Sequence, residues 1–249
     1  MEIRRAALIG MGAIGTVYGA RLDQTYGPDF AVIAGGSRAK RLKEQGVSLN
    51  GKIFFPRIAE PGAAFEADLL IVSVKNYQLD GAIEDMRGLG GTGTVILPLL
   101  NGITARDRLS EAFPRNTVLY GLSIYIDAVR TGRDVVHTKD GVIQFGEAGN
   151  QNPSPVVKAV ERYLNGAGIS TEVCPDMIRA VWKKWMMNVG GNQVSAATRS
   201  TYGKIAAVPS TRRLVHEAML EVVALANAAG IGLTELDALE IEESFSGVS

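Results

Sequence analysis

Residues 6–15, AALIGMGAIG, decide the fold of this chain. An apolar run ends at Ile9, and three glycines follow in the spacing G-x-G-x-x-G. A strand that passes through such glycines into a helix is typical of dinucleotide-binding α/β folds. The first glycine allows a tight turn, the second lets a pyrophosphate approach the backbone, and the third lets helix and strand pack closely. The predicted cofactor-binding segment is therefore Gly10, Met11, Gly12, Ala13, Ile14 and Gly15.

The pattern of this first strand and helix continues along the chain. The apolar runs FAVIAG, DLLIVSV and TVILPLL alternate with helix-like segments at 14–22, 38–45 and 77–86. Such alternation predicts an α/β fold whose parallel, Rossmann-type doubly wound sheet is covered on both faces. Runs between about 117 and 147 lack helices and predict an antiparallel extension of that sheet, and patterns after 156 are almost wholly helical. We expect an NADP-binding domain at 1–170 and an all-helical substrate and catalytic domain at 171–249.

Composition narrows the classes of partner. Lys+Arg and Asp+Glu both number 26, so the net charge is zero and no general attraction to nucleic acid or anionic membrane is expected. Apolar runs are far shorter than the roughly 20 residues that a membrane span needs. The N-terminus MEIRRAALIG leaves no signal peptide, and the single Cys174 fits packing in a reducing compartment. We expect a cytoplasmic protein with a small-molecule substrate and no metal site.

The segment after the second strand indicates which nicotinamide cofactor is bound. NAD-binding folds place an Asp or Glu there to accept from the ribose 2'-hydroxyl, but residues 30–43, FAVIAGGSRAKRLK, contain no acid. Ser37 and Arg38 are positioned instead to hold a 2'-phosphate, with Lys40 and Arg41 close behind. The alternative is an ordinary helix start followed by solvated basic residues. With the glycine loop upstream, the pattern favours NADPH/NADP+ over NAD.

Polar residues also follow two other predicted strands. DLLIVSV runs into Lys75, and TVILPLL ends at Asn101. Either residue alone is ordinary, since lysines are mostly exposed and Asn-Gly is a common turn. Ligands of open α/β sheets bind at the carboxyl ends of the strands, however. We therefore expect Lys75 and Asn101 beside the nicotinamide.

A second unusual stretch lies at residues 182–193, WKKWMMNVGGNQ. In an α-helix, Lys184, Asn188 and Asn192 would share one face because they are spaced four apart. The two glycines between the asparagines each disfavour a helix interior by about 0.8–1.0 kcal/mol relative to alanine. We therefore expect a ligand, or the backbone of the cofactor domain, to approach this helix closely.

With GMGAIG, SVKN, LLNG and the K-x-x-x-N-x-x-x-N helix in this order, the chain resembles the ketopantoate reductases (2-dehydropantoate 2-reductases) over nearly its whole length. The resemblance implies NADPH-dependent reduction of 2-dehydropantoate to pantoate, on the route to pantothenate and coenzyme A. It also implies a Rossmann-type domain, a helical domain and an active site in the cleft between them. Arg38 resembles the arginine that meets the 2'-phosphate.

The resemblance also implies roles for five further residues. Lys184 resembles the catalytic lysine that protonates the ketone oxygen as hydride arrives from the nicotinamide. Asn188 and Asn192 resemble the substrate-binding asparagines of the same helix. Lys75 and Asn101 resemble the residues that bracket nicotinamide and substrate. The expected substrate is a small 2-oxo acid.

The end of the chain departs from the family pattern. The family's substrate-binding serine and C-terminal glutamate have no counterpart before the final ESFSGVS. Leu233, Leu236, Leu239 and Phe245 also have little downstream sequence to cover them. We therefore expect that the helical domain is incomplete here, and that further chain or a second subunit of a homodimer covers these side chains.

Three other functions are compatible with these motifs. The first is reduction of another small 2-oxo acid. The second is a different two-domain reductase, such as a hydroxy-acid or opine dehydrogenase. The third is a non-catalytic NADPH-binding sensor, which the missing carboxylate favours and the Lys-Asn-Asn pattern disfavours.

Overall fold

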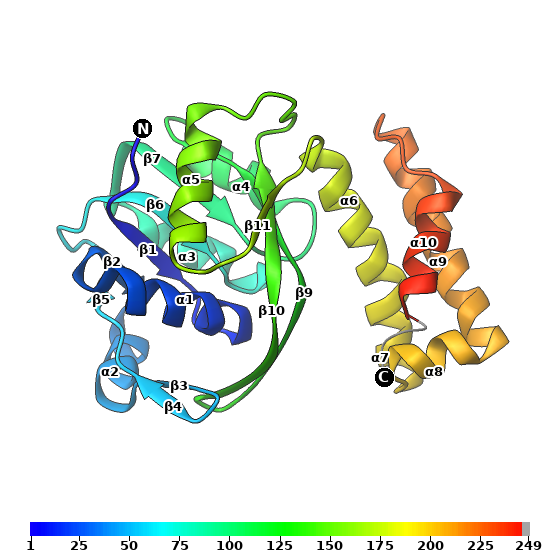
Figure 1. Cartoon of the computed structure of the whole chain (residues 1–249), viewed down its shortest axis with the longest axis horizontal. Helices are drawn as coiled ribbons and strands as arrows, with labels where there is room; N and C mark the ends of the chain where they lie inside the picture. The colour runs from blue at the N-terminus through cyan, green and yellow to red at the C-terminus, as the bar shows by residue number, and fades with distance from the viewer. Residues whose placement is uncertain (246–249) are drawn as a thin grey trace. The chain divides into compact units, whose positions relative to one another are not determined.

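A six-stranded parallel sheet lies at the centre of the first of two compact units, Met1–Met177 and Ile178–Ser249. The computed structural model describes residues 1–245. The strand order is β5-β2-β1-β6-β7-β8, so the chain reverses its direction of travel across the sheet between β1 and β6 (Figure 1). This confirms the predicted doubly wound topology, which places ligands at that switch point. The strands are β1 Ala6–Ile9, β2 Phe30–Ile33, β5 Ile58–Ala59, β6 Ala67–Val72, β7 Gly90–Pro98 and β8 Thr117–Val118.

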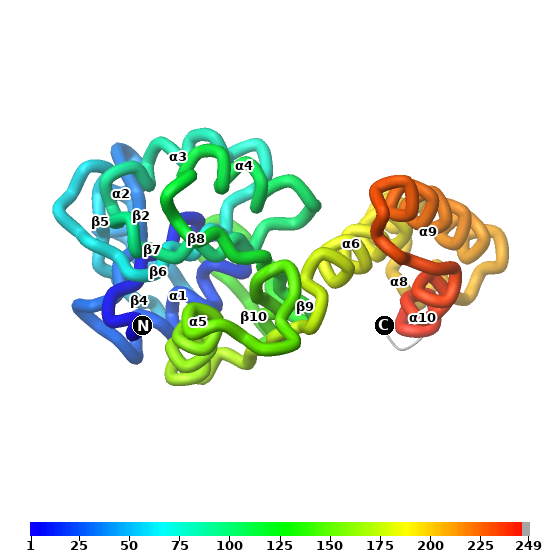
Figure 2. Tube along the Cα trace, turned by 90° about the horizontal axis from the view of Figure 1, so that it is seen from above, coloured from blue at the N-terminus to red at the C-terminus, as the bar shows by residue number. Residues whose placement is uncertain are grey.

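Helices cover both faces of this sheet, because alternate strand residues point to opposite sides. Leu8 and Leu69 belong to the core under α1 and α5, whereas Ile9 and Leu70 belong to the core under α3 and α4. Figure 2 shows these two pairs of helices on opposite sides of the strands. The helices of this unit are α1 Ala13–Tyr26, α2 Gly36–Gln45, α3 Leu79–Met86, α4 Ala105–Ala112 and α5 Pro155–Gly166, with short 3-10 turns η1 Gly27–Asp29 and η2 Asn76–Gln78.

A second, mixed sheet contains the predicted antiparallel extension. Its main feature is the long hairpin of β9 and β10, in which Thr131 pairs with Asp134 next to the turn. β10 also pairs in parallel with β3 and β11, so the hairpin belongs to a sheet of its own, distinct from the six parallel strands. The strands are β3 Val47–Leu49, β4 Lys52–Phe54, β9 Tyr120–Thr131, β10 Asp134–Gly146 and β11 Thr171–Val173.

The second unit is helical, as predicted. Met186, Met219 and Phe245 lie in its core. None of the helices within residues 1–245 has the length and apolar character needed to cross a bilayer. The elements are α6 Met177–Met187, a π-helical segment Asn188–Asn192, α7 Gln193–Thr198, α8 Tyr202–Ala207, α9 Pro209–Ala228 and α10 Glu235–Phe245.

The regular α-helix expected across residues 182–193 ends at Met187. From Asn188 the backbone is π-helical, and the N–H of Gln193 donates to the carbonyl oxygen of Asn188, five residues earlier. A π-helical turn inside an α-helix inserts one extra residue, and such turns are frequent at functional sites. The prediction of one uninterrupted α-helical face over this stretch is therefore wrong.

The two glycines of this segment allow helices of the same unit to pack closely. A Cβ on Gly190 would lie 2.6 Å from Cγ of Met219, and one on Gly191 would lie 2.7 Å from Cζ of Phe245. The expectation of a close approach was thus correct, but in the structure the approaching groups are side chains of α9 and α10. A ligand or the cofactor domain is not needed to explain the glycines.

The terminal apolar residues fall into two groups. Leu233 and Phe245 are buried in the helical core, so the expectation that they lack cover is wrong. Leu236 and Leu239 remain 69% and 37% exposed.

Candidate functional site

Three strands end side by side at one edge of the parallel sheet. Ile9 of β1 pairs with Val72 of β6, and Val72 pairs with Pro98 of β7. The pairing continues one residue further, since the N–H of Ser73 donates to the carbonyl oxygen of Ile9 at 2.8 Å and that of Leu99 donates to Val72 at 2.8 Å. The loops that carry the glycines, Lys75 and Asn101 therefore leave the sheet next to one another.

The glycine loop has the geometry that a dinucleotide requires. Gly10 has φ 104°, and a Cβ there would lie 2.5 Å from the backbone of Ser73. A Cβ on Gly15 would lie 1.9 Å from the carbonyl oxygen of Gly10. Nothing lies within 4 Å of the Cβ position of Gly12, which caps α1 without a side-chain hydrogen bond. Packing thus requires two of the glycines, and the third leaves open space at a helix N-terminus, where a phosphate is stabilised.

Substitutions at two glycines of this loop are expected to have different effects, one on the stability of the fold and the other on the affinity for NADPH. Gly12→Ala should leave the melting temperature nearly unchanged and weaken NADPH binding at least tenfold, because its methyl group enters the open space. Gly15→Ala should destabilise the protein by about 3 kcal/mol or more, because the new methyl group would overlap the backbone of Gly10, which cannot rotate away as a side chain can. Thermal unfolding and NADPH fluorescence titration measure the two effects. Unchanged NADPH affinity of Gly12→Ala would contradict this account of the loop.

The loops after β6 and β7 touch each other. Lys75 and Asn101 are both exposed, and the backbone N–H of Lys75 donates to Oε1 of Gln78 at 3.2 Å. Gly102 has φ 97°, and a Cβ there would lie 3.9 Å from Nδ2 of Asn76. The structure therefore brings the two predicted loops together and leaves the side chains of Lys75 and Asn101 accessible.

Basic residues gather at the end of β2. Helix α2 begins at Gly36, so Ser37 and Arg38 occupy its exposed first turn. Lys40 forms an ion pair with Glu44 at 3.9 Å. Neither Arg38 nor Arg41 has an acidic partner in the part of the chain that the structure describes. The positive charges of these two guanidinium groups are therefore available to an anionic group, such as a ribose 2'-phosphate.

Arg130 of β9 is a candidate cofactor-site residue that the sequence analysis missed. Its Nη1 donates to the carbonyl oxygen of Met11 in the glycine loop, and its Nε donates to that of Gly132 at 2.8 Å. Burial, followed by the charges of Arg41 and Arg38, lowers the pKa of Arg130. No local pattern could have found it, because Arg130 and Met11 are 119 positions apart and only the hairpin register brings them together.

Two adjacent lysines of α6 have different environments in the helical unit. Nζ of Lys183 lies 3.1 Å from Oδ1 of Asp237 and 2.6 Å from Oε2 of Glu240, and although burial opposes it, this pairing raises the pKa of Lys183. Burial lowers the pKa of the half-buried Lys184 to about 8. At neutral pH Lys184 is then mostly protonated and still acidic enough to donate a proton.

The amides of Asn188 and Asn192 are ordered by each other and by a tyrosine. Nδ2 of Asn192 donates to Oδ1 of Asn188 at 3.0 Å, and the hydroxyl of Tyr202 donates to Oδ1 of Asn192. The Tyr202 ring stacks on Phe245 with centroids 4.7 Å apart. Tyr202 has no motif that would have revealed this role from the sequence. Within residues 1–245, Nδ2 of Asn188 has no acceptor, which leaves it able to donate to a ligand.

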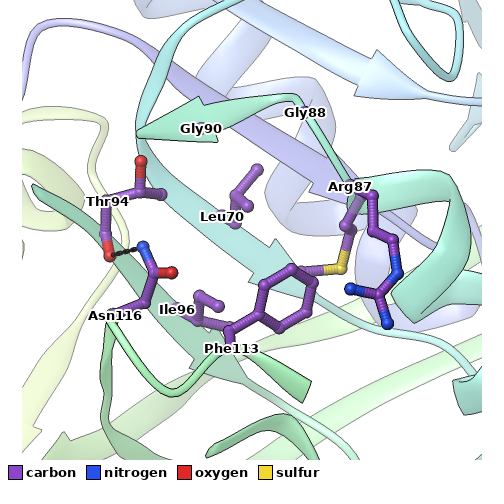
Figure 3. Close-up of a pocket in the computed structure, with 9 residues that line it drawn as sticks. Leu70, Arg87, Gly88, Gly90, Thr94, Ile96, Phe113 and Asn116 are labelled. Atoms are coloured by element: carbon purple, nitrogen blue, oxygen red, sulfur yellow. Dashed lines mark hydrogen bonds between the residues drawn. The ribbon is translucent and has the colours of Figure 1, made fainter. Parts of the chain in front are cut away.

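A pocket of about 240 Å³ lies elsewhere in the first unit (Figure 3). Its wall includes Gly90 and Thr94 at the amino-terminal end of β7, where Nδ2 of Asn116 donates to the carbonyl oxygen of Thr94 at 3.0 Å. The glycine loop, Lys75 and Asn101 follow the carboxyl ends of their strands. This pocket is therefore separate from the candidate nucleotide site.

The strand order, the glycine loop and the open helix N-terminus define a Rossmann-type protein of the class that binds a dinucleotide cofactor. Residues 6–150 match the family Ketopantoate reductase PanE/ApbA, and residues 176–245 match the family Ketopantoate reductase PanE/ApbA C terminal. The chain belongs to this family of 2-dehydropantoate 2-reductase-like oxidoreductases. The resemblance seen in the sequence is thereby confirmed.

Individual relatives agree with this assignment. The 2-dehydropantoate 2-reductase of Halobacterium salinarum is 30% identical over 241 residues, which cover 93% of this chain and 78% of that protein. The crystal structure of 2-dehydropantoate 2-reductase from Geobacter metallireducens superposes with a TM-score of 0.83 at 26% identity, covering 97% of this chain and 82% of that one. D-mandelate dehydrogenase with NADH and anilino(oxo)acetate superposes with a TM-score of 0.85 at 22% identity, covering 97% and 79%, which is a likeness of fold.

Proposed function

We propose that this protein catalyses the NADPH-dependent reduction of 2-dehydropantoate to pantoate. The observation that carries the proposal is the contrast between Lys183, held by two carboxylates, and Lys184, whose pKa burial lowers to about 8. A proton donor with such a pKa suits the reduction of a ketone at neutral pH. The 30% identity to a 2-dehydropantoate 2-reductase supports this choice of substrate.

The first unit would hold the cofactor. The pyrophosphate fits the open space at Gly12, and Ser37 and Arg38 would bind the ribose 2'-phosphate. Lys75 and Asn101, at the ends of two adjacent strands, would contact the nicotinamide and substrate. A bound reduced nicotinamide supplies a hydride to the carbonyl carbon of the substrate.

The second unit would supply the proton. As negative charge develops on the substrate oxygen, the ammonium of Lys184 stabilises it and then transfers a proton to it, which yields the hydroxyl product. Because this charge is larger in the transition state than in the ground state, the interaction accelerates the reaction. The resulting neutral amine regains a proton from solvent. Asn188 and Asn192 would bind the polar groups of the substrate, since an amide can both donate and accept.

A second candidate is the reduction of another small 2-oxo acid. The likeness of fold to D-mandelate dehydrogenase, whose structure contains NADH and anilino(oxo)acetate, favours this alternative. The two candidates share the roles of Lys184 and the glycine loop. They differ in the substrate side chain and in the cofactor.

Steady-state kinetics should distinguish the candidates. We expect 2-dehydropantoate to cause loss of NADPH fluorescence with a kcat/KM at least tenfold above that of 2-oxoisovalerate or benzoylformate. With NADH in place of NADPH, kcat/KM should fall by roughly tenfold to a hundredfold, since a charge-assisted contact to the 2'-phosphate is lost. A preference for benzoylformate and NADH would establish the second candidate instead. Binding of NADPH without turnover of any 2-oxo acid would indicate a sensor.

A further inference from the structure

Three arginines from separate parts of the sequence converge in the first unit. Arg38 and Arg41 are three residues apart on α2 and therefore share a face of that helix. Arg130 belongs to β9, whose hairpin turn reaches the end of α2, since Nη1 of Arg133 donates to the carbonyl oxygen of Gln45 at 3.3 Å. The charges of Arg38 and Arg41 act on the Arg130 guanidinium. Among residues 1–245, none of the three forms an ion pair with a carboxylate.

Two hydrogen bonds hold the guanidinium of Arg130 in place, and its other N–H groups can still donate to a ligand. Nη1 donates to the carbonyl oxygen of Met11, and Nε donates to that of Gly132 at 2.8 Å. No described residue accepts a hydrogen bond from Nη2. Because a guanidinium has five N–H donors in a planar fork, its remaining donors can bind two oxygens of one phosphate.

The charges of this cluster favour an anion. Burial first, then the charges of Arg41 and Arg38, lower the pKa of Arg130, so both neighbouring cations repel its charge. Lys40, on the same helix, is instead neutralised by Glu44 at 3.9 Å. Within residues 1–245, therefore, the three arginines have no acidic partner, whereas their neighbour Lys40 has one. A dianion placed among the three guanidinium groups would remove the repulsion.

We propose that Arg130 determines cofactor specificity: together with Arg38 and Arg41 it binds the 2'-phosphate of NADPH, and through Met11 it links that phosphate to the glycine loop. The inference rests on the proposed function, because it concerns the cofactor assigned there. A ribose 2'-hydroxyl carries no charge and cannot neutralise the cluster. The arrangement therefore distinguishes NADPH from NADH at a residue outside the segment that follows β2.

The test measures binding without turnover. Calorimetric titration compares 2',5'-ADP with 5'-AMP, which differ only in the 2'-phosphate. It is carried out on the unmodified protein and on the variants Arg130→Gln, Arg38→Gln, Arg41→Gln and Lys40→Gln. We expect Arg130→Gln and Arg41→Gln each to weaken 2',5'-ADP by roughly tenfold to a hundredfold and to change 5'-AMP by less than about threefold. The matched control Lys40→Gln should change the ratio of the two affinities by less than about twofold.

The possible outcomes are distinct. Equal weakening of both probes by Arg130→Gln would mean that Arg130 only supports the glycine loop, which would overturn the inference. Unchanged binding in Arg130→Gln, with strong loss in Arg38→Gln, would overturn it and leave the proposed NADPH preference intact. Failure of the unmodified protein to prefer 2',5'-ADP would overturn that preference itself. If Arg130→Gln does not fold, Arg130→Lys, which keeps the charge and loses the fork, should still lower the preference for 2',5'-ADP.

Discussion

Lys184→Met is expected to lower kcat for 2-oxo acid reduction by about 10²- to 10⁴-fold, the range for loss of a general acid. The ratio kcat/KM should fall to the same extent, because the interaction forms fully only in the transition state. The affinity for NADPH should stay within about twofold, since the cofactor segment belongs to the first unit. Stopped-flow measurement of NADPH oxidation, with NADPH titration as a second readout, checks both parts.

Lys183→Met is the matched control for this experiment. Lys183 is the neighbouring lysine of α6, but its ammonium is held by Asp237 at 3.1 Å and Glu240 at 2.6 Å. This variant should keep most of its turnover and lose stability instead. If Lys183→Met lost activity while Lys184→Met kept it, the assignment of the proton donor would be wrong by one residue.

The same assignment predicts the direction of the pH dependence. Burial lowers the pKa of Lys184 from 10.5 to about 8, so its ammonium is the main form below pH 8 and is lost above it. The rate of ketone reduction should therefore fall as pH rises through about 8. Oxidation of the alcohol, which needs the neutral amine as a base, should rise over the same interval. A pH-rate profile of Lys184→Met that kept this break would assign it to another group.

Asp237→Ala is expected to reduce the free energy of unfolding of the helical unit by about 3–5 kcal/mol, as for other buried ion pairs that lose one partner. The Asp237 carboxylate is buried and accepts from Nη2 of Arg179 at 2.7 and 2.8 Å. It also lies 3.1 Å from Nζ of Lys183 and accepts from the backbone N–H of Thr234 at 2.9 Å. The substitution leaves two cations and the start of α10 without their shared acceptor.

Urea denaturation, followed by the fluorescence of Trp182 and Trp185 in α6, measures this loss. Glu240→Ala is the control, because Glu240 also pairs with Lys183 but is 66% exposed, and exposed pairs contribute at most about 1 kcal/mol. Equal midpoints for the two variants would refute the role of Asp237.

The Asp237 contribution should also depend on pH. Burial alone would raise the pKa of Asp237, but hydrogen bonds from Thr234, Lys183 and Arg179 outweigh it and hold that pKa below 3.8. The folded state therefore binds the proton less tightly than the unfolded state does. The stabilisation is fully present above the unfolded pKa and is lost as pH falls through the lower folded value. Asp237→Ala should lack this part of the acid sensitivity.

The sequence alone determined the fold and the nucleotide loop, because both depend on local interactions. The positive φ of Gly10 and the contact of Gly15 with the carbonyl oxygen of Gly10 both arise within the loop, and alternation of apolar strands with helices is enough to predict a parallel sheet. The lack of an acid in residues 30–43 is likewise visible without coordinates. Such features can be recognised in one sequence because each depends on residues that are close together along the chain.

Only the tertiary structure decided how residues of the same type differ in protonation and in the groups that they contact. Lys183 and Lys184 are adjacent and identical in type, yet Asp237, 54 positions after Lys183, raises the pKa of Lys183, whereas burial lowers that of Lys184. Arg130 becomes a candidate cofactor residue only because the β9–β10 hairpin brings it to Met11. The burial and charge environment of these side chains depends on segments that are distant in sequence. The hydrophobic periodicity of a chain does not predict which distant segments will be in contact.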